Sequence, residues 1–234
     1  MSRVAIVQSN YLPWKGYFDL IASVDVFVLY DSVQYTRRDW RNRNKIKTRD
    51  GLRWITVPVQ VKGRYLQTIA ETELSGNDWV NEHLSAIRHA YARTPSFADT
   101  FAWLEEQLAA APRTSIAALN RHLIEACCRR LGITTEIRDS SEFVLSEGRN
   151  ERLADICRDL GATEYVSGPA AKDYMDASVF AERGITVRWK SYTGYRPYEQ
   201  LHPPFEHGVS VIDLMCSTGA EAPAFLRSAE PFEP

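Results

Sequence analysis

Short apolar segments of strand length alternate with helical segments along much of this chain. The first two, "VAIVQ" (residues 4–8) and "VDVFVLYD" (24–31), flank "GYFDLIAS" (16–23), which is long enough for about two helical turns. The order of strand, helix and strand returns after residue 133. Because parallel strands need crossover connections, this alternation predicts an α/β fold with a mostly parallel sheet and helices on both faces.

Two insertions interrupt the alternation. Residues 41–59, "RNRNKIKTRDGLRWITVPV", predict a β-hairpin with Asp50 and Gly51 as its two-residue turn. Residues 68–74 fit one further strand, and a helical segment with three helices is predicted at about residues 77–131. The fold expected from these patterns is a parallel sheet with a basic β-hairpin and a helical insertion.

The composition is that of an ordinary globular protein. Hydrophobic residues make up 44% of the chain and charged residues 25%, so residues 1–234 are predicted to form a single α/β domain. The net charge of −2 argues against a protein that is basic overall. No apolar run approaches the roughly 18 residues that span a bilayer, and no signal-peptide pattern is present, so we expect a cytoplasmic protein without a membrane partner. The tail after Gly219 has few anchoring residues and is expected to fray.

Polar and aromatic side chains cluster where the first two predicted strands end. In an open parallel sheet, ligands bind beyond the carboxyl ends of the strands. The segment "QSNYLPWKGYFDLI" begins at the end of the first strand, and "LYDSVQYTRRDW" begins at the end of the second. The aromatic residues of the first segment fit a packing role equally well. The predicted substrate-binding residues are Gln8, Asn10, Tyr11, Trp14, Tyr17, Asp31, Gln34 and Arg38.

The predicted hairpin carries a strong local positive charge. Residues 37–53 include eight basic and two acidic side chains, an excess of six positive charges in a chain of net charge −2. Alternate positions of an extended strand share one face, so five cations are expected to point the same way: Arg41, Arg43, Lys45, Lys47 and Arg49. Such a face suits the phosphates of a nucleotide, a nucleotide-sugar, coenzyme A or the acceptor end of a tRNA. The competing interpretation is a charged edge strand that resists aggregation.

Two later segments add candidate residues. In "YVSGPAAKDYMD", backbone N–H groups near Ser167 and Gly168 are suited to a phosphate or carboxylate, and Lys172 is a candidate for charge stabilisation or proton transfer. In "KSYTGYRPYEQLHPPFEHGVSVIDL", His202 is a candidate general base. His202 and His207 have no identifiable third ligand, so no metal site is predicted. The cysteines also lack metal-ligand spacing and are predicted to be buried thiols: Cys127, Cys128, Cys157 and Cys216.

These segments resemble the WbqC-like family, and the resemblance runs over nearly the whole chain. It is carried by "QSNYLPWKGYFDLI", "VDVFVLYDSVQYTRRDWRNRNKIK", "YVSGPAAKDYMD" and "YEQLHPPFEHGVSVIDLMCSTG". The combination is specific to this family, whose members are associated with surface-polysaccharide or specialised-metabolite pathways. The resemblance implies a role in such a pathway without implying a particular reaction.

The chain is also distantly similar to pantothenate synthetase and related nucleotidylyltransferases. Those enzymes begin with a strand and a helix that bears an H-x-G-H motif, and their next strand ends in a glutamine–aromatic pair. Here "LPWKGYFDLI" resembles the helix start and Gln34–Tyr35 resembles the pair, which implies a Rossmann-like nucleotide-binding sheet. Trp14 and Tyr17 stand where the two phosphate-holding histidines would be, so the similarity does not imply ordinary adenylyl transfer.

The strand-end clusters and the basic face together favour a transferase or ligase. The predicted reaction joins an activated acyl, aminoacyl or nucleotidyl group, carried by a phosphate-bearing donor, to a small-molecule acceptor. ATP or another nucleotide is compatible as the cofactor, and Mg²⁺ is compatible with it. The alternatives are an aminoacyl-tRNA-dependent transferase, with tRNA as the partner, and a non-catalytic nucleotide-binding module. The predicted phosphate-binding residues are Arg41, Arg43, Lys45, Ser167 and Gly168.

Overall fold

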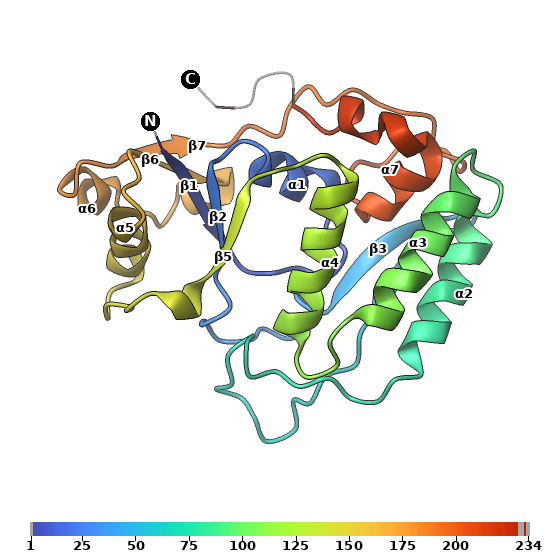
Figure 1. Cartoon of the computed structure of the whole chain (residues 1–234), viewed down its shortest axis with the longest axis horizontal. Helices are drawn as coiled ribbons and strands as arrows, with labels where there is room; N and C mark the ends of the chain where they lie inside the picture. Colours follow the sequence, from blue (N-terminus) through green and yellow to red (C-terminus); the bar gives the residue numbers. More distant parts are fainter. Residues whose placement is uncertain (1, 229–231, 233–234) are drawn as a thin grey trace.

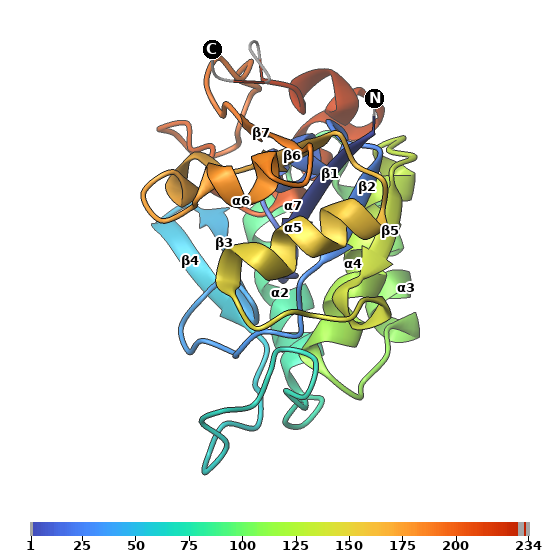
Figure 2. The same ribbon diagram turned by 90° about the vertical axis from the view of Figure 1, so that its left-hand side faces the viewer.

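The computed structural model describes residues 2–228 and residue 232 of the chain. Its centre is a five-stranded parallel sheet with helices on both faces (Figures 1 and 2), which confirms the predicted α/β fold. In spatial order the strands are β5, β2, β1, β6 and β7. Their bounds are Arg3–Val7 for β1, Val26–Leu29 for β2, Glu136–Asp139 for β5, Glu164–Ser167 for β6 and Thr186–Trp189 for β7.

β1 lies in the middle of the sheet and pairs in parallel with β2 on one side and with β6 on the other. The chain first builds the half that contains β1, β2 and β5, and then crosses to the other edge with β6 and β7. This is the strand order of a Rossmann-like sheet, in which a crevice opens at the carboxyl ends of the strands where the order reverses. In this molecule the reversal lies between β1 and β6.

Alternating side chains of β1 enter two different cores. Ala5 and Val7 pack on the face that α1 and α4 cover, whereas Val4 and Ile6 pack on the face that α5 and α6 cover. Figure 2 shows α5 and α6 in front of the sheet. The bounds of these helices are Lys15–Ile21 for α1, Ile116–Arg130 for α4, Arg149–Asp159 for α5 and Ala177–Ala181 for α6.

The hairpin and the remaining helices extend the layer of α1 and α4 (Figure 1). β3 and β4 pair antiparallel, with Thr48 opposite Gly51. The turn is therefore Arg49–Asp50, one residue earlier than predicted. Ile46 of β3 is buried in the same core as α2, α3 and α7. The bounds are Arg43–Thr48 for β3, Gly51–Thr56 for β4, Trp79–Tyr91 for α2, Phe97–Ala110 for α3 and Val211–Thr218 for α7.

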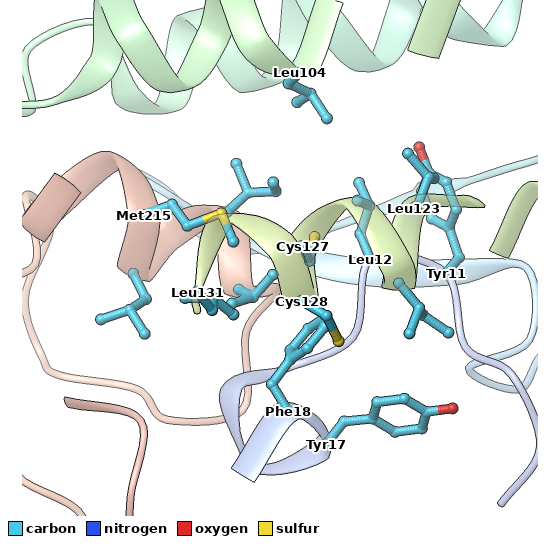
Figure 3. Close-up of a cluster of buried hydrophobic side chains, with 14 of the residues drawn as sticks. Tyr11, Leu12, Tyr17, Phe18, Leu104, Leu123, Cys127, Cys128, Leu131 and Met215 are labelled. Carbon is cyan, nitrogen blue, oxygen red and sulfur yellow. The ribbon is translucent and has the colours of Figure 1, made fainter. Parts of the chain in front are cut away.

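The larger core lies around α4, and Figure 3 shows part of it. Leu12 and Phe18, from the segment that follows β1, share this cluster with Cys127 and Cys128 of α4 and with Met215 of α7. All four cysteines are buried free thiols, as predicted. Burial raises each thiol pKa, in Cys128 and Cys216 to about 12, so these side chains act as apolar packing groups.

Two further local predictions were wrong within the described residues. Residues 68–74 do not form a strand. The tail after Gly219 continues as a short 3₁₀ helix, η3 (Gly219–Phe225), and Leu226 is buried behind it. Beyond residue 228 only residue 232 belongs to the described part of the chain, so the fraying predicted for residues 229–231, 233 and 234 lies outside the described residues. None of the helices between residues 2 and 228 combines the length and the apolar composition that crossing a bilayer requires.

Candidate functional site

A pocket of about 650 Å³ opens at the carboxyl edge of the sheet. It lies at the ends of β1 and β6, where the strand order reverses and where sheets of this type bind ligands. The start of α5 and the short 3₁₀ helix η2 (Pro169–Ala171) complete its walls. We call it the sheet-edge pocket. The polar side chains that line it are Gln8, Tyr30, Gln34, Glu147, Arg149, Arg152, Tyr165, Ser167 and Tyr174.

Four predicted site residues meet in this pocket. Gln8 follows β1, and Ser167 and Gly168 stand at the end of β6. Gln34 reaches the pocket from the loop after β2, where its Nε2 donates to the carbonyl oxygen of Tyr65 at 2.6 Å. The rule that ligand groups gather at the carboxyl ends of parallel strands therefore places these four residues together.

The cations of the sheet-edge pocket come from α5 and not from the hairpin. Arg149, the first residue of α5, is exposed, and its guanidinium carbon lies 4.0 Å from the ring centroid of Tyr174. Arg152 lies one helical turn later and lines the same pocket. The carboxylate of Glu151 lies over Gly148. A Cβ added at Gly148 would lie 1.8 Å from Oε2 of Glu151. The helix start thus already faces a carboxylate, and the guanidinium groups of Arg149 and Arg152 are the arginine and lysine cations that line the pocket.

The two predicted catalytic residues lie in different places. Lys172 directly follows η2, next to the lining residue Ala171, and its Nζ lies 5.7 Å from the ring centroid of Trp189. His202 belongs to the last loop, where its Nε2 lies 3.3 Å from the carbonyl oxygen of Ala90 in α2. Of the two, only Lys172 is on a loop that lines the pocket. Among the described residues, no three His, Cys, Asp or Glu side chains are grouped to hold a metal ion.

The aromatic residues just after β1 mostly fill the core. Tyr11 is fully buried, and its hydroxyl donates to Nδ1 of His83 at 3.0 Å, since Nε2 of that imidazole faces the carbonyl oxygen of Thr56. Tyr17 is also buried and donates to the carbonyl oxygen of Gln8 at 3.1 Å. Neither phenol lines a described pocket, which agrees with the packing interpretation rather than with direct ligand contact.

Asn10 and Trp14 line a second pocket, of about 250 Å³. Trp14 precedes α1, and its indole covers Gly16, where an added Cβ would lie 2.2 Å from the ring. The glycine is therefore needed for the indole to lie against the helix start. We call this cavity the indole pocket, and its lining residues are Asn10, Pro13, Trp14, Trp40, Asn44 and Gly208.

Asp31 is buried behind the edge of the sheet. Its Oδ1 accepts from the backbone N–H of Ser9 at 2.8 Å, and its Oδ2 has no hydrogen-bond partner among the described residues. Burial raises the pKa of this carboxyl group, and the bond from Ser9 opposes the rise. Ser9 directly follows Gln8, which lines the sheet-edge pocket. The bond to Asp31 therefore fixes the backbone beside this pocket.

The predicted cationic face is not one surface. Arg41 Nη1 binds Oδ1 of Asn10 and lies 3.4 Å from the carbonyl oxygen of Gln8. Lys47 is buried, and its Nζ donates to the carbonyl oxygen of Pro204. Both side chains therefore hold loops together inside the molecule.

Arg43 and Lys45 stay near the surface, where both lie beside the ring of Trp54. Arg38 is exposed in the left-handed backbone region, with φ of 61°, and its carbonyl oxygen accepts from Arg43. None of these three residues lines the sheet-edge pocket.

The sequence analysis missed a buried lysine at the start of α1. Lys15 Nζ lies 4.8 Å, 5.3 Å and 5.8 Å from the ring centroids of three residues of the last loop, Tyr195, Tyr198 and Phe205. Burial lowers the Lys15 pKa to about 8, although Asp19 opposes the change. The aromatic residues of the last loop thus enclose an amine of the first helix, and no local sequence pattern signals this contact.

Arg149 and Arg152 were also missed, although a signal for them exists. The helix that follows β5 in a right-handed crossover must begin at the same sheet edge as the ends of β1 and β2. Basic residues in its first turn are therefore directed toward that edge.

Comparison with known proteins agrees with the resemblance seen in the sequence. The sequence profile of the WbqC-like protein family matches residues 8–225. The uncharacterized protein Rv1507c of Mycobacterium tuberculosis (strain ATCC 25618 / H37Rv) is 52% identical over 227 residues, which cover 97% of this chain and 98% of that protein. No solved structure matches the chain. The profile covers Gln8, β6 and the α5 wall of the sheet-edge pocket, and this chain belongs to the WbqC-like protein family.

Proposed function

We propose that this protein is a transferase or ligase that binds a phosphate-bearing donor in the sheet-edge pocket. The observation that supports this best is the position of the pocket, at the reversal of strand order in a Rossmann-like parallel sheet. The donor is a nucleotide or a carrier-linked compound, and the transferred group is acyl, aminoacyl or nucleotidyl. The acceptor is a small molecule.

The polar groups of the pocket suit such a donor. Arg149 and Arg152 offer guanidinium groups, which bind phosphate oxygens in a bidentate way. Gln8 and Gln34 offer carboxamides that both donate and accept hydrogen bonds. The pocket therefore combines charge for the phosphates with neutral groups that orient the rest of the donor.

In the proposed reaction, a nitrogen or oxygen atom of the acceptor forms a bond to the activated carbon or phosphorus atom. The bond from that atom to the phosphate or carrier breaks, the leaving group departs with the electron pair, and the proton that the acceptor atom loses passes to water. Negative charge develops on the leaving group, so a nearby cation lowers the barrier. We assign this role to Lys172, on the loop that lines the pocket.

The second candidate is a non-catalytic nucleotide-binding module. The observation that favours it is the packing of Trp14 and Tyr17, which stand where related nucleotidylyltransferases carry phosphate-holding histidines. Tyr17 is buried and Trp14 lies against Gly16, so neither group reaches the sheet-edge pocket. The two candidates differ in turnover: a module leaves the donor intact in the presence of amine and hydroxyl acceptors, whereas a transferase releases the leaving group.

The proposal is tested by calorimetric titration with ATP, CTP, a UDP-sugar and acetyl-coenzyme A, each with and without Mg²⁺. At least one class is expected to bind, and the double variant Arg149→Ala/Arg152→Ala is expected to bind it about tenfold more weakly or worse. Arg129, an exposed arginine of α4 outside the pocket, provides the matched control Arg129→Ala. Failure of every class to bind, or equal binding by the double variant and the control, would contradict the proposal.

A further inference from the structure

Two tryptophans share an exposed surface at the hairpin. Trp40 precedes β3 and Trp54 belongs to β4, and their ring centroids lie 5.1 Å apart. Trp40 and Trp54 are 38% and 39% exposed, although large aromatic residues are normally removed from water. The hairpin lies at the outside of the molecule in Figure 2. Flat, exposed indoles offer stacking surfaces to a planar ligand.

Cations flank both rings. Lys45 stands directly opposite Trp54 across the hairpin, and its Nζ lies 5.1 Å from that ring and 5.6 Å from the ring of Trp40. The guanidinium carbon of Arg43 lies 4.0 Å from the Trp54 ring. Asp39, the residue before Trp40, pairs with Arg41 at 3.6 Å. We call Trp40, Trp54, Arg43 and Lys45 the tryptophan platform.

The indole pocket adjoins the tryptophan platform through Trp40, which belongs to both. Trp14 and Pro13 give this cavity apolar walls, and Asn10 and Asn44 place carboxamides in it. The side chain of Asn44 is already bound to the carbonyl oxygens of Tyr11 and Leu12, whereas Nδ2 of Asn10 has no hydrogen bond among the described residues. A cavity with indole walls and an amide donor fits one nucleobase that is turned out of the stack formed by its neighbouring bases.

We propose that the tryptophan platform and the indole pocket bind single-stranded nucleic acid. One base enters the indole pocket, neighbouring bases stack on Trp40 and Trp54, and Arg43 and Lys45 bind the phosphates. An edge strand that only resists aggregation needs charge but no exposed indoles. This inference is independent of the sheet-edge pocket, which Trp40, Trp54, Arg43 and Lys45 do not line.

The test is fluorescence anisotropy with short labelled single strands of RNA and of DNA, and with a duplex, AMP and a polyglutamate peptide as competitors. The single strand of RNA, DNA or both is expected to bind, and the double variant Trp40→Ala/Trp54→Ala to bind about tenfold more weakly or worse. The matched control is Trp103→Ala, which removes a partly buried indole of α3. The guanidinium carbon of Arg130 lies 5.0 Å from the ring centroid of Trp103. This control is expected to bind as wild type.

The salt dependence gives a second readout. Arg43→Ala/Lys45→Ala removes two phosphate contacts, so the slope of log K against log salt is expected to become shallower by about 1.4, whereas the tryptophan variant keeps the wild-type slope. Quenching of tryptophan fluorescence in the wild-type protein provides a measurement that needs no variant. Equal affinity for AMP, duplex or polyglutamate, no quenching, or equal binding by the tryptophan variant and Trp103→Ala would overturn the proposal.

Discussion

Lys190 Nζ lies 2.8 Å from Oδ2 of Asp19, and both side chains are fully buried. The same oxygen accepts from the hydroxyl of Tyr195 at 2.8 Å and from the backbone N–H of Ser228 at 3.1 Å. Asp19 belongs to α1, Lys190 follows β7, and Ser228 lies in the tail. One buried carboxylate thus joins the first helix to the last strand and to the C-terminal segment.

Removing one partner of this pair leaves the other charge unpaired in the interior. Lys190→Met is expected to lower the free energy of unfolding by about 3–5 kcal/mol, which urea denaturation followed by circular dichroism measures. The control Arg64→Met breaks the exposed pair of Arg64 and Glu73 (3.0 Å) and is expected to cost less than about 1 kcal/mol. Equal losses in the two variants would contradict a structural role for the buried pair.

Gly16 and Gly168 should respond differently to an added methyl group. At Gly16 a Cβ would lie 2.2 Å from the indole of Trp14, so Gly16→Ala is expected to cost about 1–3 kcal/mol, although alanine favours a helix. At Gly168 the nearest atom would be the hydroxyl of Tyr192 at 3.8 Å, so Gly168→Ala should be tolerated. Thermal unfolding measures the stability of the two variants, Gly16→Ala and Gly168→Ala. Wild-type stability of Gly16→Ala would show that the indole moves aside freely.

A larger side chain at Gly168 should separate binding from folding. This residue lines the sheet-edge pocket with an extended backbone that any residue adopts. Gly168→Leu is therefore expected to keep the wild-type melting temperature within a few degrees while it weakens donor binding about tenfold or more, because it fills the pocket. Calorimetry and thermal unfolding of Gly168→Ala and Gly168→Leu measure both quantities. Undiminished donor binding by Gly168→Leu would place the donor elsewhere.

Acid should weaken the fold through His83. Burial lowers the pKa of this imidazole from 6.5 to about 4. Between these pH values the unfolded chain binds a proton at His83 that the folded chain does not bind. The part of the unfolding free energy that depends on an uncharged His83 is therefore complete above pH 6.5 and is lost as the pH falls toward 4. The loss amounts to about 3 kcal/mol. Urea denaturation across this range measures it.

His83→Gln keeps one donor and one acceptor for Thr56 and Tyr11 and is expected to flatten the pH dependence of the unfolding free energy. The matched control is His89→Gln, which alters an exposed histidine of the same helix. If the slope of His83→Gln were as steep as that of His89→Gln, another group would have to cause the acid sensitivity.

The sheet was predictable because apolar strands and helices alternate along the chain, and the strand-end rule placed Gln8, Gln34, Ser167 and Gly168 in one pocket. The orientation of the hairpin cations was not predictable from alternation. Arg41 and Lys47 turn inward because Asn10 and the carbonyl of Pro204 accept their hydrogen bonds. Both partners are distant in sequence from the cation they bind, so a local pattern contains no information on them.

The packed tail illustrates the same limit. A segment with few apolar residues predicts a fraying end, yet the backbone N–H of Ser228 donates to the carboxylate of Asp19 in the first helix. Arg149 and Arg152 are a different case, because the crossover rule directs the start of α5 to the sheet edge and would have identified them.

The most direct measurement for the central claim is hydrogen exchange of the wild-type protein with and without the donor class found by calorimetry. Slower exchange is predicted in residues 147–153 and 167–175, which form two walls of the sheet-edge pocket. Protection confined to residues 37–56, the hairpin and the segment before it, would contradict donor binding at the sheet edge.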